Sequence, residues 1–277
     1  HRSDLWGSRG QKYAQLLETD VSNTAWASVS PCTPFYLFVP QDVAVRAEYM
    51  QGWKITEVMP VHGVGMTTAR DDFVIDMEEE SLVERILAFK ESPLSDDELH
   101  REFSIRRKKG WNIRKAWNML QSFSRQDVSK LVAQVSYRPF DKRFIFYHDS
   151  LVWRTVKKIM HHMLARENVG LLTKRQGKRD PYSYTFITHN ICEGCVFESA
   201  YANNTIHPLY LYPDHRSLAL LYPQESTGTS GDRQANFNPE FIADLCQHLG
   251  LRFIPDGRCD LSQTFGPEDA FHYTYAV

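Results

Sequence analysis

The hydrophobic positions of this 277-residue chain follow two different periods. Apolar residues that recur every three or four positions predict amphipathic helices over residues 82–89, 113–120, 156–164 and 241–249. Short apolar runs bounded by polar residues, Pro or Gly predict strands at residues 35–39, 57–61, 73–75, 131–137, 144–147, 169–173, 184–187, 196–197, 209–212 and 218–222. Short strands mixed irregularly with helices favour an α+β fold, with mostly antiparallel strands and packed helices, over a doubly wound sheet.

Cap signals place several of the helix ends. Ser81 with Glu84, and Ser95 with Glu98, have the spacing of capping boxes and predict two helix starts. Asn238, with Pro at the next position, predicts the start of a third helix, which a Gly at position 250 ends.

Two turns break the apolar runs. Pro139 predicts the turn between two central strands, because Pro cannot donate a hydrogen bond into a sheet interior. Gly63 and Gly65 follow a predicted strand, and they indicate either a simple turn or a place where the backbone approaches a phosphate closely.

The composition is that of a globular protein. Hydrophobic residues make up 42 % and aromatic residues 13 % of the chain, which is long enough to bury a core. No apolar run is long enough to cross a membrane and no signal pattern opens the chain, so the default expectation is a soluble protein of the cytoplasm.

Cysteine and histidine positions raise a metal hypothesis. The five cysteines are predicted to be reduced. Cys192 and Cys195 have zinc-knuckle spacing, which Cys246, His248 and Cys259 could complete; buried or idle thiols are the alternative interpretation. A second candidate, the adjacent histidines at 161 and 162, is predicted to be an exposed polar pair, since neighbouring helix residues point in different directions.

Positive charge is concentrated in one stretch. The chain has a net charge of −2, yet residues 137–179 hold eleven Lys or Arg and only three acids, a net charge of +8 that leaves −10 for the rest. Aromatic residues are interleaved with these cations, as a groove for a polyanion with flat bases requires. A solvated basic face beside a half-buried strand is the alternative.

The common catalytic patterns are absent from the sequence. No acid lies two positions before a Lys, and there is no P-loop, no Gly-x-Ser-x-Gly turn and no His-Glu-x-x-His helix. The nearest match to the Asn-Pro-Pro-aromatic turn that holds a flipped adenine begins at Asn238, but Glu240 replaces its second Pro, so we predict a helix cap there. The chain is interpreted as a reader of nucleic acid more than a catalyst.

Several segments, in order, suggest a family: GSRGQKY at residues 7–13, HGVGMTTARDDF at 62–73, YRPFDKR at 137–143, WR at 153–154, LLTKRQ at 171–176 and PLYLY at 208–212. With these segments the chain resembles the C-terminal specificity region of type ISP restriction–modification enzymes. These enzymes combine nuclease, translocase, adenine methyltransferase and target-recognition parts in one polypeptide.

The resemblance implies a domain plan and partners. Residues 1–56 would connect from an upstream methyltransferase domain, and residues 57–277 would form a target recognition domain that lacks its C-terminal end. The implied function is sequence-specific recognition of double-stranded DNA, which directs N6-adenine methylation and restriction by upstream domains. No cofactor is expected in this chain; S-adenosylmethionine would bind the upstream methyltransferase, and the translocase would be a further partner in the same polypeptide.

The candidate DNA contacts follow from charge and side-chain shape. Lysines are predicted mainly to neutralise phosphates, whereas Arg and Gln pair bidentately with guanine and adenine edges. The candidates are Arg70, Arg138, Lys142, Arg143, Trp153, Arg154, Lys157, Lys158, Lys174, Arg175, Gln176, Lys178 and Arg179. The rival hypothesis is a scaffold that docks the methyltransferase onto the translocase without touching bases; a third, retained methyltransferase activity, requires the Asn238 turn to be catalytic.

Overall fold

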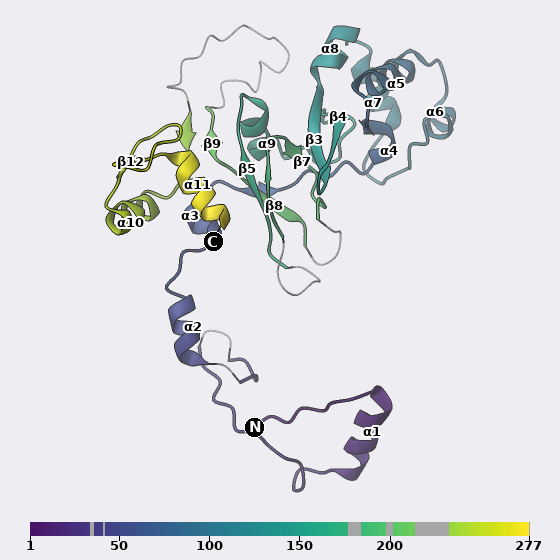
Figure 1. Cartoon of the computed structure of the whole chain (residues 1–277). Coiled ribbons are helices and arrows are strands. Elements are labelled where there is room, and N and C mark those ends of the chain that lie inside the picture. Colours follow the sequence, from purple (N-terminus) through teal and green to yellow (C-terminus); the bar gives the residue numbers. More distant parts are fainter. Residues whose placement is uncertain (34–35, 41, 177–183, 198–201, 214–232, 277) are drawn as a thin grey trace. The chain divides into compact units, whose positions relative to one another are not determined.

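The computed structural model describes residues 1–33, 36–40, 42–176, 184–197, 202–213 and 233–276 (Figure 1). By its internal contacts the chain divides into two compact units, His1–Trp53 and Lys54–Val277, here called the N-terminal unit and the large unit.

The N-terminal unit contains two short helices, α1 (Arg9–Glu18) and α2 (Val43–Tyr49). Ser8 and Gln11 form a capping box at the start of α1, and the Asp42 carboxylate caps α2. Neither helix has a buried residue. The strand predicted at residues 35–39 is wrong for its described part, because residues 36–39 are exposed and pair with no strand. An apolar run forms a buried strand only where a sheet accepts it.

One sheet of the large unit has the order β2–β4–β3–β7. Its centre is an antiparallel hairpin, and β7 adds to β3 in parallel. Helices pack against this sheet: α5 contacts β2 and β4, and it also contacts the helices α7 and α8. The bounds are β2 (Ile75–Asp76), β3 (Val132–Arg138), β4 (Asp141–Phe146), β7 (Ile191–Cys192), α4 (Asp71–Val74), α5 (Glu79–Glu91), α6 (Asp96–Glu102), α7 (Ile113–Leu120) and α8 (Arg125–Lys130).

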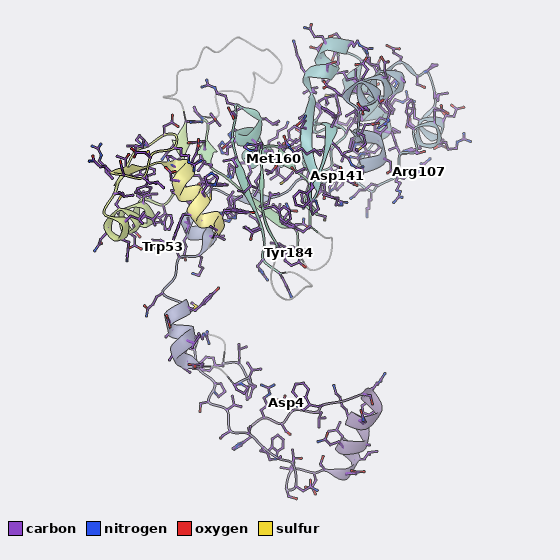
Figure 2. The ribbon with its side chains drawn as sticks, viewed as in Figure 1. Asp4, Trp53, Arg107, Asp141, Met160 and Tyr184 are labelled. Atoms are coloured by element: carbon purple, nitrogen blue, oxygen red, sulfur yellow. The ribbon has the colours of Figure 1, made fainter. Side chains whose placement is uncertain are left out.

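The second sheet has the order β1–β8–β5–β6 and is antiparallel throughout. Its bounds are β1 (Gly63–Val64), β5 (Gly170–Lys174), β6 (Thr185–Thr188) and β8 (Asn204–Pro208). Helix α9 (Lys157–Leu164) contacts strands of both sheets. Its buried Met160, labelled in Figure 2, belongs to a core cluster that also includes Ile145 from the first sheet and Leu172 from the second. The two sheets therefore share one hydrophobic core.

A second core cluster lies among the C-terminal elements. It is centred on buried aromatic residues such as Tyr210, Phe241 and Phe271. Its elements are α3 (Ile55–Val58), β9 (Tyr210–Leu211), β10 (Gln234–Ala235), α10 (Pro239–Leu249), β11 (Arg252–Phe253), β12 (Thr264–Phe265) and α11 (Pro267–Ala276). Strands β9 and β10 pair antiparallel, whereas β11 and β12 pair in parallel.

The predicted α+β fold with mostly antiparallel strands is confirmed. The predicted helical faces are buried as expected in α5 and α7, and the Ser95 capping box starts α6. The prediction that a capping box at Ser81 starts a helix is wrong, because α5 already begins at Glu79. Acidic residues at its N-terminus interact favourably with the helix dipole without a Ser cap.

Three predicted strands differ in the structure. Residues 55–58 form α3, most of residues 73–75 lies in α4, and residues 196–197 lie outside any strand. These runs are only two to five residues long, too short for periodicity to separate helix, strand and loop. The strand predicted at residues 218–222 lies outside the described residues.

Candidate nucleic-acid interface

Residues 66–72 contain Arg70 and make backbone hydrogen bonds to two other predicted DNA contacts, Trp153 and Arg154. The amide of Met66 donates to the Cys192 carbonyl at 2.9 Å, and Thr67 exchanges backbone hydrogen bonds of 2.9 and 3.0 Å with Arg154. The amide of Trp153 donates to the Thr68 carbonyl at 3.2 Å. This segment therefore holds the Trp153–Arg154 pair and the end of β7 beside Arg70.

Gly65 makes this close approach of the backbones possible. A Cβ atom at position 65 would lie 2.4 Å from the Glu193 carbonyl oxygen and 2.7 Å from the Cα of Gly194. The glycine therefore serves contact between two chain segments, and the backbone of Glu193 occupies the space that a phosphate would need.

Arg70 is a buried cation with unused hydrogen-bond donors. Its side chain is 5 % exposed, its Nε donates to the Leu151 carbonyl at 2.7 Å, and its guanidinium lies 4.0 Å from the centroid of the Trp111 ring. Both terminal nitrogens are buried, and neither has a hydrogen-bond partner among the described residues. Burial lowers the pKa of Arg70 to about 10, so the group stays charged at neutral pH.

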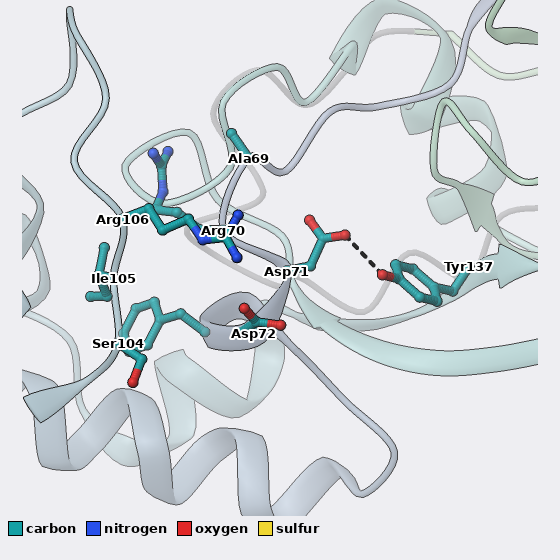
Figure 3. A pocket seen from close by; sticks show the side chains of 9 residues that line it. Ala69, Arg70, Asp71, Asp72, Ser104, Ile105, Arg106 and Tyr137 are labelled. Atoms are coloured by element: carbon teal, nitrogen blue, oxygen red, sulfur yellow. Dashed lines mark hydrogen bonds between the residues drawn. The ribbon is translucent and has the colours of Figure 1, made fainter. Parts of the chain in front are cut away.

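A pocket of about 330 Å³ opens beside Arg70. Figure 3 shows its lining, which includes Asp71, Arg106 and Tyr137. The Tyr137 hydroxyl donates to Asp71 Oδ2 at 2.9 Å, and the Thr68 hydroxyl also donates to the Asp71 carboxylate. The Asp71 carboxylate thus accepts hydrogen bonds from two neutral hydroxyl groups, and Asp72 adds a second carboxylate to the pocket lining.

The β3–β4 hairpin carries three of the predicted contacts. The guanidinium groups of Arg138 and Arg143 both lie over the Tyr137 ring, 4.0 and 4.3 Å from its centroid. Arg143 makes a bidentate pair with Asp141, at 2.8 Å for its shortest bond, and Arg138 lies 3.3 Å from the Glu193 carboxylate. Burial raises the pKa of Glu193. Lys142, by contrast, is exposed.

The predicted contacts at the start of α9 differ in their availability. Trp153 is half-buried, and Lys108 Nζ lies 4.5 Å from the centroid of its ring. Arg154 and Lys158 are exposed, whereas Lys157 forms an ion pair with Asp149.

At the end of β5, Lys174 is 2 % exposed, and its Nζ lies 5.5 Å from the centroid of the Tyr184 ring. Arg175 and Gln176 after it are exposed. Lys178 and Arg179 lie outside the described residues. Burial sets Lys174 apart from the exposed lysines that were predicted with it.

A row of aromatic rings connects the hairpin to the end of β5. Phe140 lies 5.4 Å from Phe186, Phe186 lies 5.2 Å from Phe197, and Phe197 lies 5.8 Å from Tyr184, all between ring centroids. The row brings together basic residues that are more than 30 positions apart in the sequence.

Sequence reasoning missed Trp111 and Arg106. Neither residue is among the predicted contacts, and in the sequence Trp111 has no evident relation to Arg70, which is 41 positions away. The available signal was a Trp next to clustered cations, the composition of a cation–π site.

The metal hypothesis finds no support in the described part of the chain, where no three potential ligands gather. Cys192 is fully buried, which raises the pKa of its thiol. The prediction that both adjacent histidines are exposed is wrong for His162, which is buried. Its Nδ1 accepts a hydrogen bond from the Tyr212 amide at 3.1 Å. The local pattern around His162 could not reveal this donor, because Tyr212 follows β9 and is 50 positions away in the sequence.

The Asn238 side chain caps α10 as predicted. It accepts a hydrogen bond from the Glu240 amide at 2.9 Å, and Gly250 ends the helix with φ of 65°. Its carbonyl oxygen is therefore used within the fold. Over the described residues, no helix combines the length and hydropathy needed to cross a membrane.

One family model matches most of this chain. The model of the type ISP C-terminal specificity domain matches residues 57–277. The solved DrdV–DNA complex is similar at TM-score 0.55 and 17 % identity, over 98 % of this chain and 25 % of that one. A nuclease-deletion mutant of the type ISP restriction–modification enzyme LlaGI, in complex with a DNA substrate mimic, is similar at TM-score 0.49 and 15 % identity, over 85 % of this chain and 19 % of that one. This chain thus spans a quarter or less of those two solved chains, and a search of curated proteins found no match.

Proposed function

The chain belongs to the family of type ISP C-terminal specificity domains, and from this premise we propose that it reads a sequence of double-stranded DNA. It acts as the target recognition domain of a larger type ISP restriction–modification enzyme. The DNA complex formed by the structurally similar DrdV supports this proposal by analogy of fold.

One observation carries the proposal: Arg70 lines a pocket, and its guanidinium is buried against Trp111 with no hydrogen-bond partner for either terminal nitrogen among the described residues. A buried charge without a partner is costly, so such a group indicates a ligand that brings hydrogen-bond acceptors. Phosphate oxygens and guanine edges are acceptors that match the fork of an Arg side chain.

The exposed cations divide into two roles. Lys142 and Lys158 neutralise phosphates and set the position of the duplex. The candidates for base edges are the exposed residues Arg154, Arg175 and Gln176, because Arg pairs bidentately with guanine and Gln with adenine. Arg138 and Arg143 already have carboxylate partners and mainly hold the hairpin.

The larger enzyme supplies the chemistry in this proposal. An upstream domain binds S-adenosylmethionine and methylates an adenine within the recognised sequence, and a translocase in the same polypeptide drives restriction. The enzyme acts in the cytoplasm, where its DNA substrate lies.

Residues 1–56 make the connection to the methyltransferase in this arrangement. Exposed apolar side chains in the N-terminal unit, among them Trp6 and Leu17 at 80 and 89 % exposure, favour a docking role for this unit. The scaffold function is therefore retained as a second candidate, for this unit alone.

The test is selection of a randomised duplex pool on the 277-residue chain at low and at moderate salt. A target recognition domain enriches a short motif, and its binding falls steeply as salt rises. Retention without a motif, or no retention, contradicts sequence reading by this chain. Repeating the selection with Arg70→Met tests whether the pocket takes part, since this change removes the charge and keeps the length of the stem.

A further inference from the structure

Phe140 stands at the tip of the β3–β4 hairpin. In the strand register, Arg138 of β3 lies opposite Asp141 of β4, so Pro139 and Phe140 form the two-residue turn of the hairpin. The Phe140 side chain is 93 % exposed, more than any other large hydrophobic side chain in the described part of the chain. An aromatic ring presented this way contributes little to the core.

The backbone of Phe140 is unfavourable for a Phe residue. Its φ is 62°, and Pro before it holds the first turn position near −65°, which together match a type II turn. That turn prefers Gly or Asn at the second central position, because other residues meet steric strain there. Neither burial nor turn preference therefore accounts for Phe at position 140.

The ring of Phe140 is nevertheless held in place. Phe186 packs edge-on against it, with an interplanar angle of 61°, and Phe197 stands behind Phe186. The half-buried rings behind it limit the directions that Phe140 can take while leaving most of its surface in solvent.

The charges around the tip favour a polyanion. Residues 138–143 hold three cations and one acid. Arg138 and Arg143 lie beside the carboxylates of Glu193 and Asp141, whereas Lys142, two positions from Phe140, is exposed. An exposed aromatic wedge on a basic hairpin is the combination by which proteins unstack and bend duplex DNA. A protein partner would be expected to meet a larger apolar patch, whereas here the apolar tip is a single ring between cations.

We propose that Phe140 is a wedge that inserts between adjacent base pairs of the bound duplex. This inference rests on the proposed function and adds a residue to it. The exposed cation Lys142, on the same hairpin, holds a phosphate beside the opened step. Flexible pyrimidine–purine steps are the preferred place of insertion, because they unstack at the lowest cost.

The experiment uses 2-aminopurine, whose fluorescence rises when it loses stacking, placed in turn at each step of the duplex motif obtained by selection. Four forms of the 277-residue chain are compared: wild type, Phe140→Gly, Phe140→Trp and Leu261→Gly. Leu261 is the matched control, since it is also an exposed apolar residue with positive φ, 53 % exposed at φ of 61°.

Wild type is expected to raise the fluorescence at one step only, and Phe140→Trp to retain that signal. Phe140→Gly should lose the signal and bind about 10- to 100-fold more weakly, the loss of roughly one stacked base. Its melting temperature should not fall, because Gly relieves the positive φ. Leu261→Gly should bind and unstack DNA as wild type does.

Three outcomes contradict the wedge. If Phe140→Gly binds and unstacks the duplex as wild type does, the wedge is excluded while the proposed function stands. If wild type binds without unstacking any step, Phe140 contacts DNA from outside or serves a protein partner. If wild type binds no duplex, the proposed function fails and the wedge with it.

Discussion

The hydroxyl of Tyr137 donates a hydrogen bond of 2.9 Å to the carboxylate of Asp71, residues that are 66 positions apart in the sequence. The bond joins the β3–β4 hairpin to the segment that carries Arg70. Burial raises the pKa of Tyr137, and the bond to Asp71 raises it further, so the hydroxyl remains a donor at neutral pH. Two parts of the candidate interface are thereby held in one arrangement.

This bond should appear as an energetic coupling between the hairpin and the Arg70 segment. Tyr137→Phe and Asp71→Asn are each expected to lower the free energy of unfolding by about 1 kcal/mol, with a coupling of roughly 1 kcal/mol in the double variant. Urea denaturation of the four proteins measures it. Strictly additive effects would mean that the two residues do not act together.

Arg70 is expected to matter for binding and little for stability. In Arg70→Met, the lost hydrogen bond to Leu151 and contact with Trp111 are offset by removal of a desolvated charge, so the free energy of unfolding should change by less than about 1 kcal/mol. Affinity for the selected duplex should fall about 10-fold or more.

Arg85 provides the matched control for Arg70. It donates to the carbonyls of Phe73 and Ile75 at 3.2 Å and pairs with Asp76. Arg85→Met should therefore cost about 2–3 kcal/mol of stability, while the folded protein binds DNA as before. The reverse pattern in the two variants would show that Arg70 is structural.

Arg154 and Lys158 are expected to make different contributions to DNA binding, the first specific to a base and the second independent of sequence. Arg154→Ala should cost about 1–3 kcal/mol on the preferred sequence and relax the preference at one base pair. Lys158→Ala should weaken all sequences alike and reduce the salt slope of binding by about 1. Competition binding with single-base variants of the motif, at several salt concentrations, separates the two. The exposed Lys115 of α7, changed to Ala, is the control that should alter neither quantity.

The large unit should become less stable as the pH is lowered, because His207 is buried in its neutral form. Burial lowers its pKa from 6.5 to about 4, while the Met59 carbonyl and the nearby His62 act in opposite directions. The folded state favours the neutral form of His207, whereas the unfolded chain binds a proton more readily. The contribution of His207 to the free energy of unfolding is therefore complete above pH 6.5 and is lost as the pH falls toward 4. The loss is roughly 3 kcal/mol.

Urea denaturation between pH 7 and pH 4.5 checks this expectation, with His207→Gln as the comparison. The variant should show a shallower pH dependence in this window. His148, whose pKa burial also lowers, accounts for part of the slope that remains. An unchanged slope in the variant would show that His207 is not the titrating group.

Gly65→Ala should destabilise the large unit by about 2 kcal/mol or more, because the new Cβ meets the backbone of Glu193 and Gly194. Thermal unfolding measures the loss. Gly10→Ala is the control: no atom lies near a Cβ at that helical position, so it should leave the unfolding of the large unit unchanged. Equal effects of the two changes would refute the close approach as the reason for Gly65.

Local patterns in the sequence determined the elements whose signals lie within a few residues. The β3–β4 hairpin follows from two apolar runs around Pro139, and α10 follows from its Asn238 cap and terminal Gly250. The α+β class and the concentration of basic and aromatic residues were also apparent, because composition and periodicity are properties of the chain itself.

Only the tertiary structure decided which basic residues are available. Charge alone does not distinguish buried Lys174 from exposed Arg175, or Arg143 with its carboxylate partner from exposed Lys142. Nor does it place Trp111 over Arg70, since burial and pairing depend on residues far away in the sequence. The role of a charged side chain is decided by desolvation and by its partners, and both are set by packing.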